Sequence, residues 1–154
     1  YSSLSEAIED KKGMIDYGFS IQVIEHVKNP IEFLKEIRKL IKPGGRLLIS
    51  TPNRNDILMT LLKDKFYQFF YRTQHRWYFD ESSLSYCIEK VGFTVIDFRH
   101  KHTFGLSNTL AWLKNQKPQG DIRLPGIDGS ADMFWKTYTE VSKQADTLFV
   151  MAEK

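Results

Sequence analysis

The sequence predicts an α/β domain built around a parallel sheet. Short apolar runs of strand length alternate with longer stretches of helical spacing along the chain. One helix with clear end signals lies between two such runs, an arrangement that needs a right-handed crossover. With 154 residues, of which 42% are hydrophobic, the chain is long enough for about one domain with its own core.

Two apolar runs frame the clearest strand–helix–strand unit. Residues 17–23 (YGFSIQV) predict a short buried strand, which Gly18 weakens because glycine has no side chain to pack. Residues 46–51 (RLLIST) predict a second strand, which Pro52 ends. The two strands should pair in parallel because a helix connects them.

The helix between these strands has signals at both ends. Asn29 can cap its start, and Pro30 occupies the first helical position, where a missing N–H costs nothing. One face should pack on the sheet, because apolar residues recur at helical spacing. These residues are Phe33, Leu34, Ile37, Leu40 and Ile41. Residues 43–45 (PGG) predict the end of the helix.

The second half continues the alternation less regularly. Residues 56–71 predict one amphipathic helix, and Asp80 caps another that Gly92 ends. Residues 93–98 and 147–152 predict the remaining strands. The roughly fifty residues between these strands are too many for a hairpin loop, so we expect helices at 105–114 and 132–145 around a Pro- and Gly-rich stretch.

Bulk composition narrows the functional class. The 22 basic and 19 acidic residues leave a net charge of only +3, so we expect no nucleic-acid partner. No apolar run approaches the roughly 20 residues that a membrane span needs. The single cysteine, Cys87, fits a reducing compartment, and we expect a cytoplasmic location. Because the chain begins with Tyr1, we expect it to be part of a longer protein.

Four short motifs, taken together, carry a family resemblance. They are Ile15-Asp16, Glu25-His26-Val27, residues 42–45 (KPGG) and residues 51–53 (TPN). With this order and spacing, the chain resembles class I S-adenosylmethionine-dependent methyltransferases, and is similar in type to the quinone-biosynthesis O-methyltransferases. Residues 75–98 resemble a later helix and strand of the same family.

The resemblance implies a Rossmann-like sheet in the order 3-2-1-4-5-7-6, with an antiparallel last strand and helices on both faces. Strands four to seven correspond to the four runs predicted above, and strands one to three have no counterpart. Residues 1–154 would then form the C-terminal part of a methyltransferase domain, with a helical and loop insertion at about 103–145.

The missing strands have two expected consequences. The resemblance implies S-adenosylmethionine as cofactor in the full-length parent, yet no Gly-x-Gly-x-x-Gly pattern occurs in this chain. We therefore expect the chain alone to be inactive. Strand four would also have an unpaired apolar edge, which self-association or residues 1–13 could cover.

The resemblance places a site at the carboxyl end of strand four, where open α/β sheets bind ligands. Glu25 and His26 would contact the cofactor, and His26 could act as the base, because imidazole exchanges protons near neutral pH. The alternative is structural: both residues could order the loop or cap the next helix.

A second group of polar residues could contact the acceptor. Asn53 and Arg54 follow strand five and could bind a hydroxyl or an anionic group, or could simply form a turn. His75, Arg76 and Trp77 could line an acceptor pocket, with His75 as a rival base, although Trp77 could equally belong to the core.

No metal site is expected from the sequence. The histidines of residues 99–102 (RHKH) have no nearby cysteine or acidic partner, so this segment should be a solvated strand end.

Three functional hypotheses remain. The first is the C-terminal portion of a methyltransferase that acts on a small molecule, through oxygen, nitrogen or carbon. The second is a shortened, non-catalytic relative that binds a protein through the strand-four edge. The third, an unrelated α/β binding domain, is disfavoured by the motif series.

Overall fold

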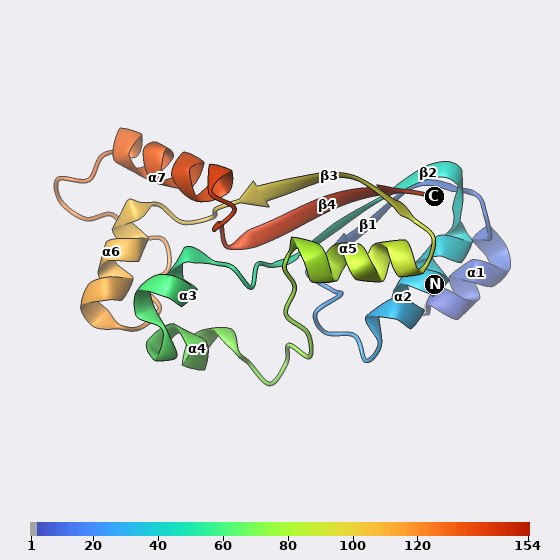
Figure 1. The fold of residues 1–154 in the computed structure, drawn as a ribbon, viewed down its shortest axis with the longest axis horizontal. Helices are drawn as coiled ribbons and strands as arrows, with labels where there is room; N and C mark the ends of the chain where they lie inside the picture. Colours follow the sequence, from blue (N-terminus) through green and yellow to red (C-terminus); the bar gives the residue numbers. More distant parts are fainter. Residues whose placement is uncertain (1–2) are drawn as a thin grey trace. The chain divides into compact units, whose positions relative to one another are not determined.

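The computed structural model describes residues 3–154, which divide into two compact units (Figure 1). The first unit contains the described residues up to Pro52, together with Arg76–Arg99 and Phe149–Lys154. The second contains Asn53–His75 and His100–Leu148.

The four strands form one sheet in the order β1-β2-β4-β3. Their bounds are β1 Ile15–Ile21, β2 Ile41–Pro52, β3 Thr94–Lys101 and β4 Thr147–Glu153. This order corresponds to the implied order 4-5-7-6. β1 and β2 are parallel, as predicted, and the antiparallel direction of the last strand stays a prediction.

Helix α2 (Pro30–Leu40) begins as the sequence predicts. The Asn29 side chain accepts hydrogen bonds from Ile31 N and Glu32 N at 3.0 and 3.2 Å, so two otherwise unpaired donors are satisfied. The apolar face of α2 packs on the sheet. Gly18 on β1 leaves room for the side chains of β2, because a Cβ there would lie 3.0 Å from Ile41 Cδ1 and 3.1 Å from Leu47 Cδ1.

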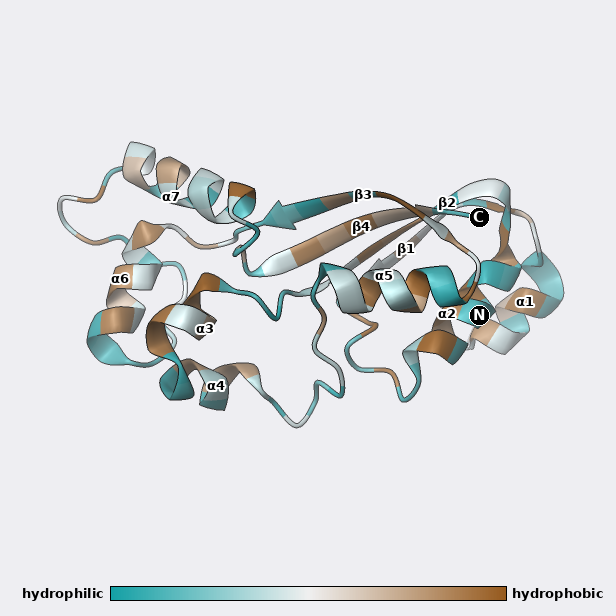
Figure 2. Cartoon of the chain, viewed as in Figure 1, coloured by the Kyte–Doolittle hydropathy of each residue, from teal (hydrophilic) through white to brown (hydrophobic). Residues whose placement is uncertain are grey.

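Helix α5 (Glu81–Lys90) is also capped as predicted. The Asp80 carboxylate accepts from Ser83 N at 2.8 Å, while Ser83 Oγ accepts from Asp80 N at 3.0 Å. In Figure 2, α5 has both apolar and polar stretches, as expected of a helix with one buried face. Cys87 packs against the core from this helix.

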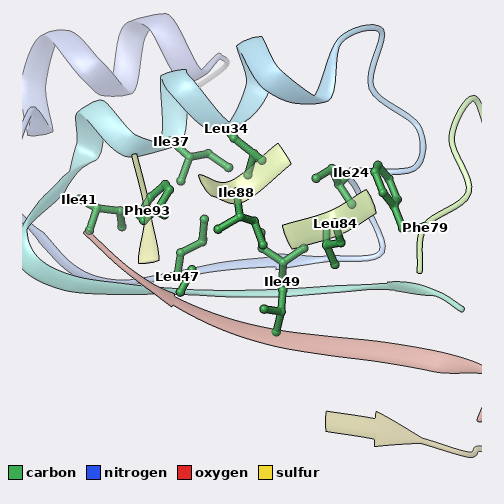
Figure 3. Packing of buried hydrophobic residues seen from close by; sticks show 12 residues of the cluster. Ile24, Leu34, Ile37, Ile41, Leu47, Ile49, Phe79, Leu84, Ile88 and Phe93 are labelled. Carbon is green, nitrogen blue, oxygen red and sulfur yellow. The ribbon is translucent and has the colours of Figure 1, made fainter. Parts of the chain in front are cut away.

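The core of the first unit lies between α2, α5 and the sheet (Figure 3). Its fully buried side chains come from helices and strands that are distant in the sequence. They include Ile24, Leu34, Ile41, Leu47, Ile49, Leu84, Ile88 and Val150. Burial of each such side chain contributes about 1.5–3 kcal/mol, so this cluster fixes the ends of β1 and β2 from which the loops leave.

Two expectations for the first unit need correction. Strand β2 starts at Ile41, directly after α2, and therefore includes the Pro-Gly-Gly segment that was predicted as a turn. The bonds Gly44 N to Lys154 O at 2.8 Å and Lys154 N to Gly45 O at 3.0 Å hold this segment in the sheet. Helix α1 (Leu4–Lys11) was not predicted at all.

The second unit is helical. Its helices are α3 (Ile57–Leu62), α4 (Asp64–Phe70), α6 (Leu106–Asn115) and α7 (Gly129–Val141). The single helix predicted for residues 56–71 is wrong, because Lys63, with φ of 47°, separates α3 from α4. Phe66 packs edge-on against Trp112, with 5.4 Å between ring centroids.

The predicted solvated strand end at residues 99–102 is wrong for His102. Its side chain is buried, and its Nδ1 accepts a hydrogen bond from Asp146 N at 3.1 Å. Burial lowers the pKa of His102, against an opposing effect of the Asp146 carboxylate. Asp146 is close to His102 in space but 44 residues away in the sequence, so the prediction could not include it.

Strand β1 lies at one end of the sheet order and has an exposed apolar row. Tyr17, Phe19 and Ile21 alternate along it and are 62%, 71% and 48% exposed. The N-terminal helix contacts α2 and leaves these three side chains uncovered. Among residues 3–154, no helix is long and apolar enough to cross a membrane.

Candidate functional site

The carboxyl ends of β1 and β2 bring polar side chains together in the first unit. Parallel strands end at the same edge of a sheet, so the loop after β1 meets the last residues of β2. The chain leaves β1 at Gln22, whose φ is 53°, and residues 23–29 form the loop that leads to α2. Gln22 N donates to Ser50 O at 3.0 Å, which keeps the start of the loop beside β2.

Glu25 supplies the carboxylate of this loop and is buried, with 1% of its surface exposed. Its Oε2 accepts a hydrogen bond from Thr51 Oγ1 at 3.1 Å. Its Oε1 is buried and has no hydrogen-bond partner among the residues that the structure describes. A buried carboxylate oxygen without a donor is costly, so Glu25 is ready to accept a bond from a ligand.

His26 lies beside this carboxylate and faces solvent. Its Nε2 is 3.8 Å from Glu25 Oε1, and 43% of the His26 side chain is exposed. The loop therefore places an exposed imidazole directly beside a buried carboxylate.

Arg76 and Trp77 are tied to the same loop. Arg76 N and Trp77 N both donate to Glu25 O, at 2.8 and 3.2 Å, and Trp77 Nε1 donates to Val27 O at 3.0 Å. Both side chains are exposed, and the indole is 43% exposed. Four predicted site residues, Glu25, His26, Arg76 and Trp77, therefore come together in the first unit. The indole of Trp77 holds the loop through its bond to Val27 O. Trp77 is exposed and does not belong to the core, which was the alternative.

Asn53, Arg54 and His75 belong to the second unit. Asn53 is buried, and its Nδ2 donates to Lys143 O at 3.1 Å and Ala145 O at 2.8 Å. Its Oδ1 accepts from Asn55 N at 3.0 Å, which forms the local turn that was the alternative to a substrate contact. Both amide protons of Asn53 are thus used by the backbone. His75 is half-buried, and its N donates to Arg72 O at 3.1 Å.

Arg54 lines a polar cleft of about 340 Å³ in the second unit. The cleft also contains Asp56, which is 4% exposed and accepts a hydrogen bond from Leu58 N at 2.8 Å. Burial raises the pKa of Asp56 to about 7, although the Leu58 bond acts in the opposite direction, and the Asp146 charge raises it further.

Two residues of these sites, Thr51 and Asp56, were not predicted from the sequence. Thr51 carried one signal, a hydroxyl at the carboxyl end of an apolar strand, but nothing in the sequence paired it with Glu25. Asp56 precedes a helical stretch and was taken only as its start. Its burial depends on residues 142–144, which line the same cleft and are far away in the sequence.

Replacing Thr51 with valine should destabilise the first unit by about 1–3 kcal/mol. The change keeps the side-chain shape but removes the one donor to Glu25, so both carboxylate oxygens become unpaired. Urea unfolding measures the difference. Thr51→Ser keeps the hydroxyl and should lose less, and equal losses in the two variants would contradict the proposed importance of this bond.

Comparisons with known proteins match this architecture. Residues 3–97 match the family described as methyltransferase domain. The ubiquinone biosynthesis O-methyltransferase of Caulobacter vibrioides is 36% identical over 62 residues, which cover 40% of this chain and 25% of that protein. The enzyme of the same name from Roseobacter denitrificans is 41% identical over 51 residues, which cover 33% of this chain and 21% of that protein.

Solved structures give the same fold. A SAM-dependent methyltransferase from Archaeoglobus fulgidus aligns with a TM-score of 0.58 at 14% identity, over 99% of this chain and 66% of that one. Phosphoethanolamine N-methyltransferase 2 of Haemonchus contortus, solved in complex with S-adenosyl-L-methionine, aligns with a TM-score of 0.53 at 17% identity. That alignment covers 93% of this chain and 34% of the other.

The fold is thus one that methyltransferases share, with polar residues gathered at the carboxyl ends of its parallel strands. Since the family match extends over more than half of the sequence, the chain belongs to the family of methyltransferase domains. The stretches that match the curated relatives cover a quarter or less of the length of those relatives.

Proposed function

We propose that this chain is the C-terminal part of an S-adenosylmethionine-dependent methyltransferase that acts on a small molecule. The observation that carries the proposal is the family match over residues 3–97, which spans the Glu25 loop and both parallel strands that position it. The helical region at about 103–145 would then be an insertion in this domain.

The residues present account for part of a cofactor site. Ser20 Oγ, like Glu25 Oε1, is buried and has no hydrogen-bond partner among the described residues. Ser20 lies near the carboxyl end of β1, and Glu25 lies in the loop that follows. Two such atoms in one region favour a polar ligand there. Glu25 and His26 are the residues that would hold it. When bound, S-adenosylmethionine supplies an electrophilic methyl group on a sulfonium sulfur.

His26 is the base in this proposal, and His75 is its rival. His26 would take the proton that an acceptor hydroxyl loses. Glu25, at 3.8 Å, stabilises the resulting imidazolium. Arg76 and Trp77 would contact the acceptor with their exposed side chains. Arg54, in the second unit, stays a candidate for binding an anionic group. Asn53 would contribute through the turn that it orders.

The chain alone should be inactive, because the sequence has no Gly-x-Gly-x-x-Gly turn to bind the cofactor. Calorimetric titration of this polypeptide with S-adenosylhomocysteine should therefore give no detectable heat. Micromolar binding would contradict the proposed need for the Gly-rich turn while supporting the cofactor class.

The same titration on the full-length parent that this proposal implies tests the activity class itself. We expect the longer protein to bind S-adenosylhomocysteine. Glu25→Ala should weaken this binding, whereas Glu89→Ala, which removes the same charge from an exposed position, should leave it unchanged. Absence of binding in the longer protein would contradict the methyltransferase proposal and favour the second candidate, a non-catalytic relative that binds a protein through β1. The exposed row Tyr17, Phe19 and Ile21 is the observation that supports this candidate.

A further inference from the structure

The first unit has a cleft of about 580 Å³ at the opposite end of β1 from Glu25. Its lining comes from four segments that the fold brings together. These residues are Lys12 and Gly13 after α1, Lys35, Arg38 and Lys39 on α2, Val91 after α5, and Lys154 after β4. In Figure 1 the C-terminus and α1 lie at this same end of the sheet. The seven residues of β1, at about 3.3 Å each, place the cleft roughly 20 Å from the candidate site.

Positive charge dominates the cleft. Of the seven lining residues, five are lysine or arginine. Lys35 pairs with Glu32 at 2.8 Å, and Lys39 pairs with Glu36 at 2.5 Å. Within residues 3–154 no carboxylate pairs with the other three cations, Lys12, Arg38 and Lys154.

Two of these three cations are held in place by the fold. Arg38 Nε donates to Gly92 O at 3.2 Å, and its guanidinium lies 6.0 Å from the centre of the Phe93 ring. Lys154 Nζ donates to Arg38 O at 2.7 Å and to Ile41 O at 2.6 Å, near the C-terminus of α2. Both groups keep further donors, because a guanidinium has five N–H groups and an ammonium has three.

The charges act on one another across the cleft. Burial lowers the pKa of Lys154, and the positive charges of Arg38 and Lys12 lower it further. Repulsion of this kind is relieved when an anion binds between the cations. The simpler interpretation is a lysine-rich surface that is only solvated. Such a surface would not explain why these side chains line one cleft, or why backbone carbonyls hold Arg38 and Lys154 in place.

We propose that this cleft binds the phosphate group of a small phosphorylated molecule. A phosphate dianion presents several acceptor oxygens, which suit the remaining donors of Arg38 and Lys154, and the planar guanidinium matches phosphate geometry. Lys12, exposed at the rim, adds the third charge. The site is separate from the loop of Glu25 and does not depend on the proposed methyl transfer.

Calorimetric titration with pyrophosphate at constant ionic strength tests the proposal. We expect one saturable site. Lys12→Gln should weaken binding about threefold or more, and Arg38→Gln about tenfold or more. Lys28→Gln, which removes the same charge from an exposed position outside the cleft, should change the affinity less than twofold.

Three results would overturn the proposal. One is the absence of saturable binding, and another is an equal loss for Lys28→Gln and Lys12→Gln. Lys12 is exposed, and its side chain has no hydrogen bond to any of residues 3–154, so Lys12→Gln should fold normally and keeps the test decisive even if Arg38→Gln unfolds. The third is stronger binding of single-stranded RNA than of pyrophosphate, with an affinity that increases with RNA length up to a dodecamer. This result would indicate a surface for a polymer. Retained binding of glycerol phosphate, with the same dependence on Lys12, would support the small-molecule source.

Discussion

Replacing Asp56 with asparagine should raise the free energy of unfolding of the second unit at pH 8 by up to about 4 kcal/mol. Burial raises the pKa of Asp56 from 3.8 to about 7, so the folded state favours the protonated carboxyl. The stability that this group contributes is present below pH 3.8 and is lost as the pH rises to about 7. Asparagine stays neutral throughout and still caps α3, because its oxygen can accept from Leu58 N.

The measurement is urea unfolding of both proteins from pH 3 to pH 8, with hydrogen exchange of the α3 and α6 amides as a local readout. The difference between the two proteins should be near zero at pH 3 and largest at pH 8. The difference is the better quantity, because the lowered pKa of His102 gives the wild-type curve a contribution of opposite sign.

Asp128→Asn is the matched control. Asp128 caps α7 in the same unit, but it is exposed, and the hydrogen bonds from the Ser130 hydroxyl and from Ala131 N and Ser130 N lower its pKa. Its replacement should therefore not stabilise the protein at pH 8. Equal stability of wild type and Asp56→Asn at pH 8 would contradict the buried, neutral carboxyl.

The second large effect concerns association through the β1 edge. We expect copies of the chain to associate there, and Phe19→Lys to weaken the association roughly 100-fold or more. Each copy would bury one Phe19, worth about 1.5–3 kcal/mol, and a two-fold contact would lose this twice. Lysine also adds like charges that face one another.

Sedimentation velocity over a range of concentrations measures the shift toward monomer. Phe134→Lys provides the control, because Phe134 on α7 is 71% exposed, as is Phe19. A wild-type chain that stays monomeric would overturn the prediction. So would a Phe134→Lys variant that loses as much association as Phe19→Lys.

Local signals made the starts of α2 and α5 predictable from the sequence. Asn29 before Pro30 and Asp80 before an apolar stripe both act on the first turn that follows them, and the structure shows both caps. Helix ends and breaks were less predictable. The break at Lys63 has no glycine or proline to mark it, and the Pro-Gly-Gly segment joins β2 through bonds to Lys154, at the far end of the chain.

For the candidate site too, only features marked by a local motif could be predicted. The motif positions Glu25 and His26 could be named because a family resemblance carried them. The bond from Thr51 to Glu25 joins residues 26 apart, and the burial of Asp56 depends on a segment about 86 residues later, so neither follows from local pattern. Contacts of this kind are set by the packing of whole elements and not by neighbouring residues.

The turn at Asn53 has a consequence for how this domain can diversify. Asn53 N donates to Asp146 O and Ile57 N donates to Gln144 O, both at 2.8 Å, so the first and last residues of the second unit lie side by side in space. A segment whose two ends are pinned together can be lengthened, shortened or exchanged with little effect on the strands that flank it. In evolution or in protein engineering, residues 53–75 and 100–148 could thus be exchanged together, while residues 76–99, which supply α5 and Trp77 to the first unit, are kept with the β1–β2 pair and the Glu25 loop.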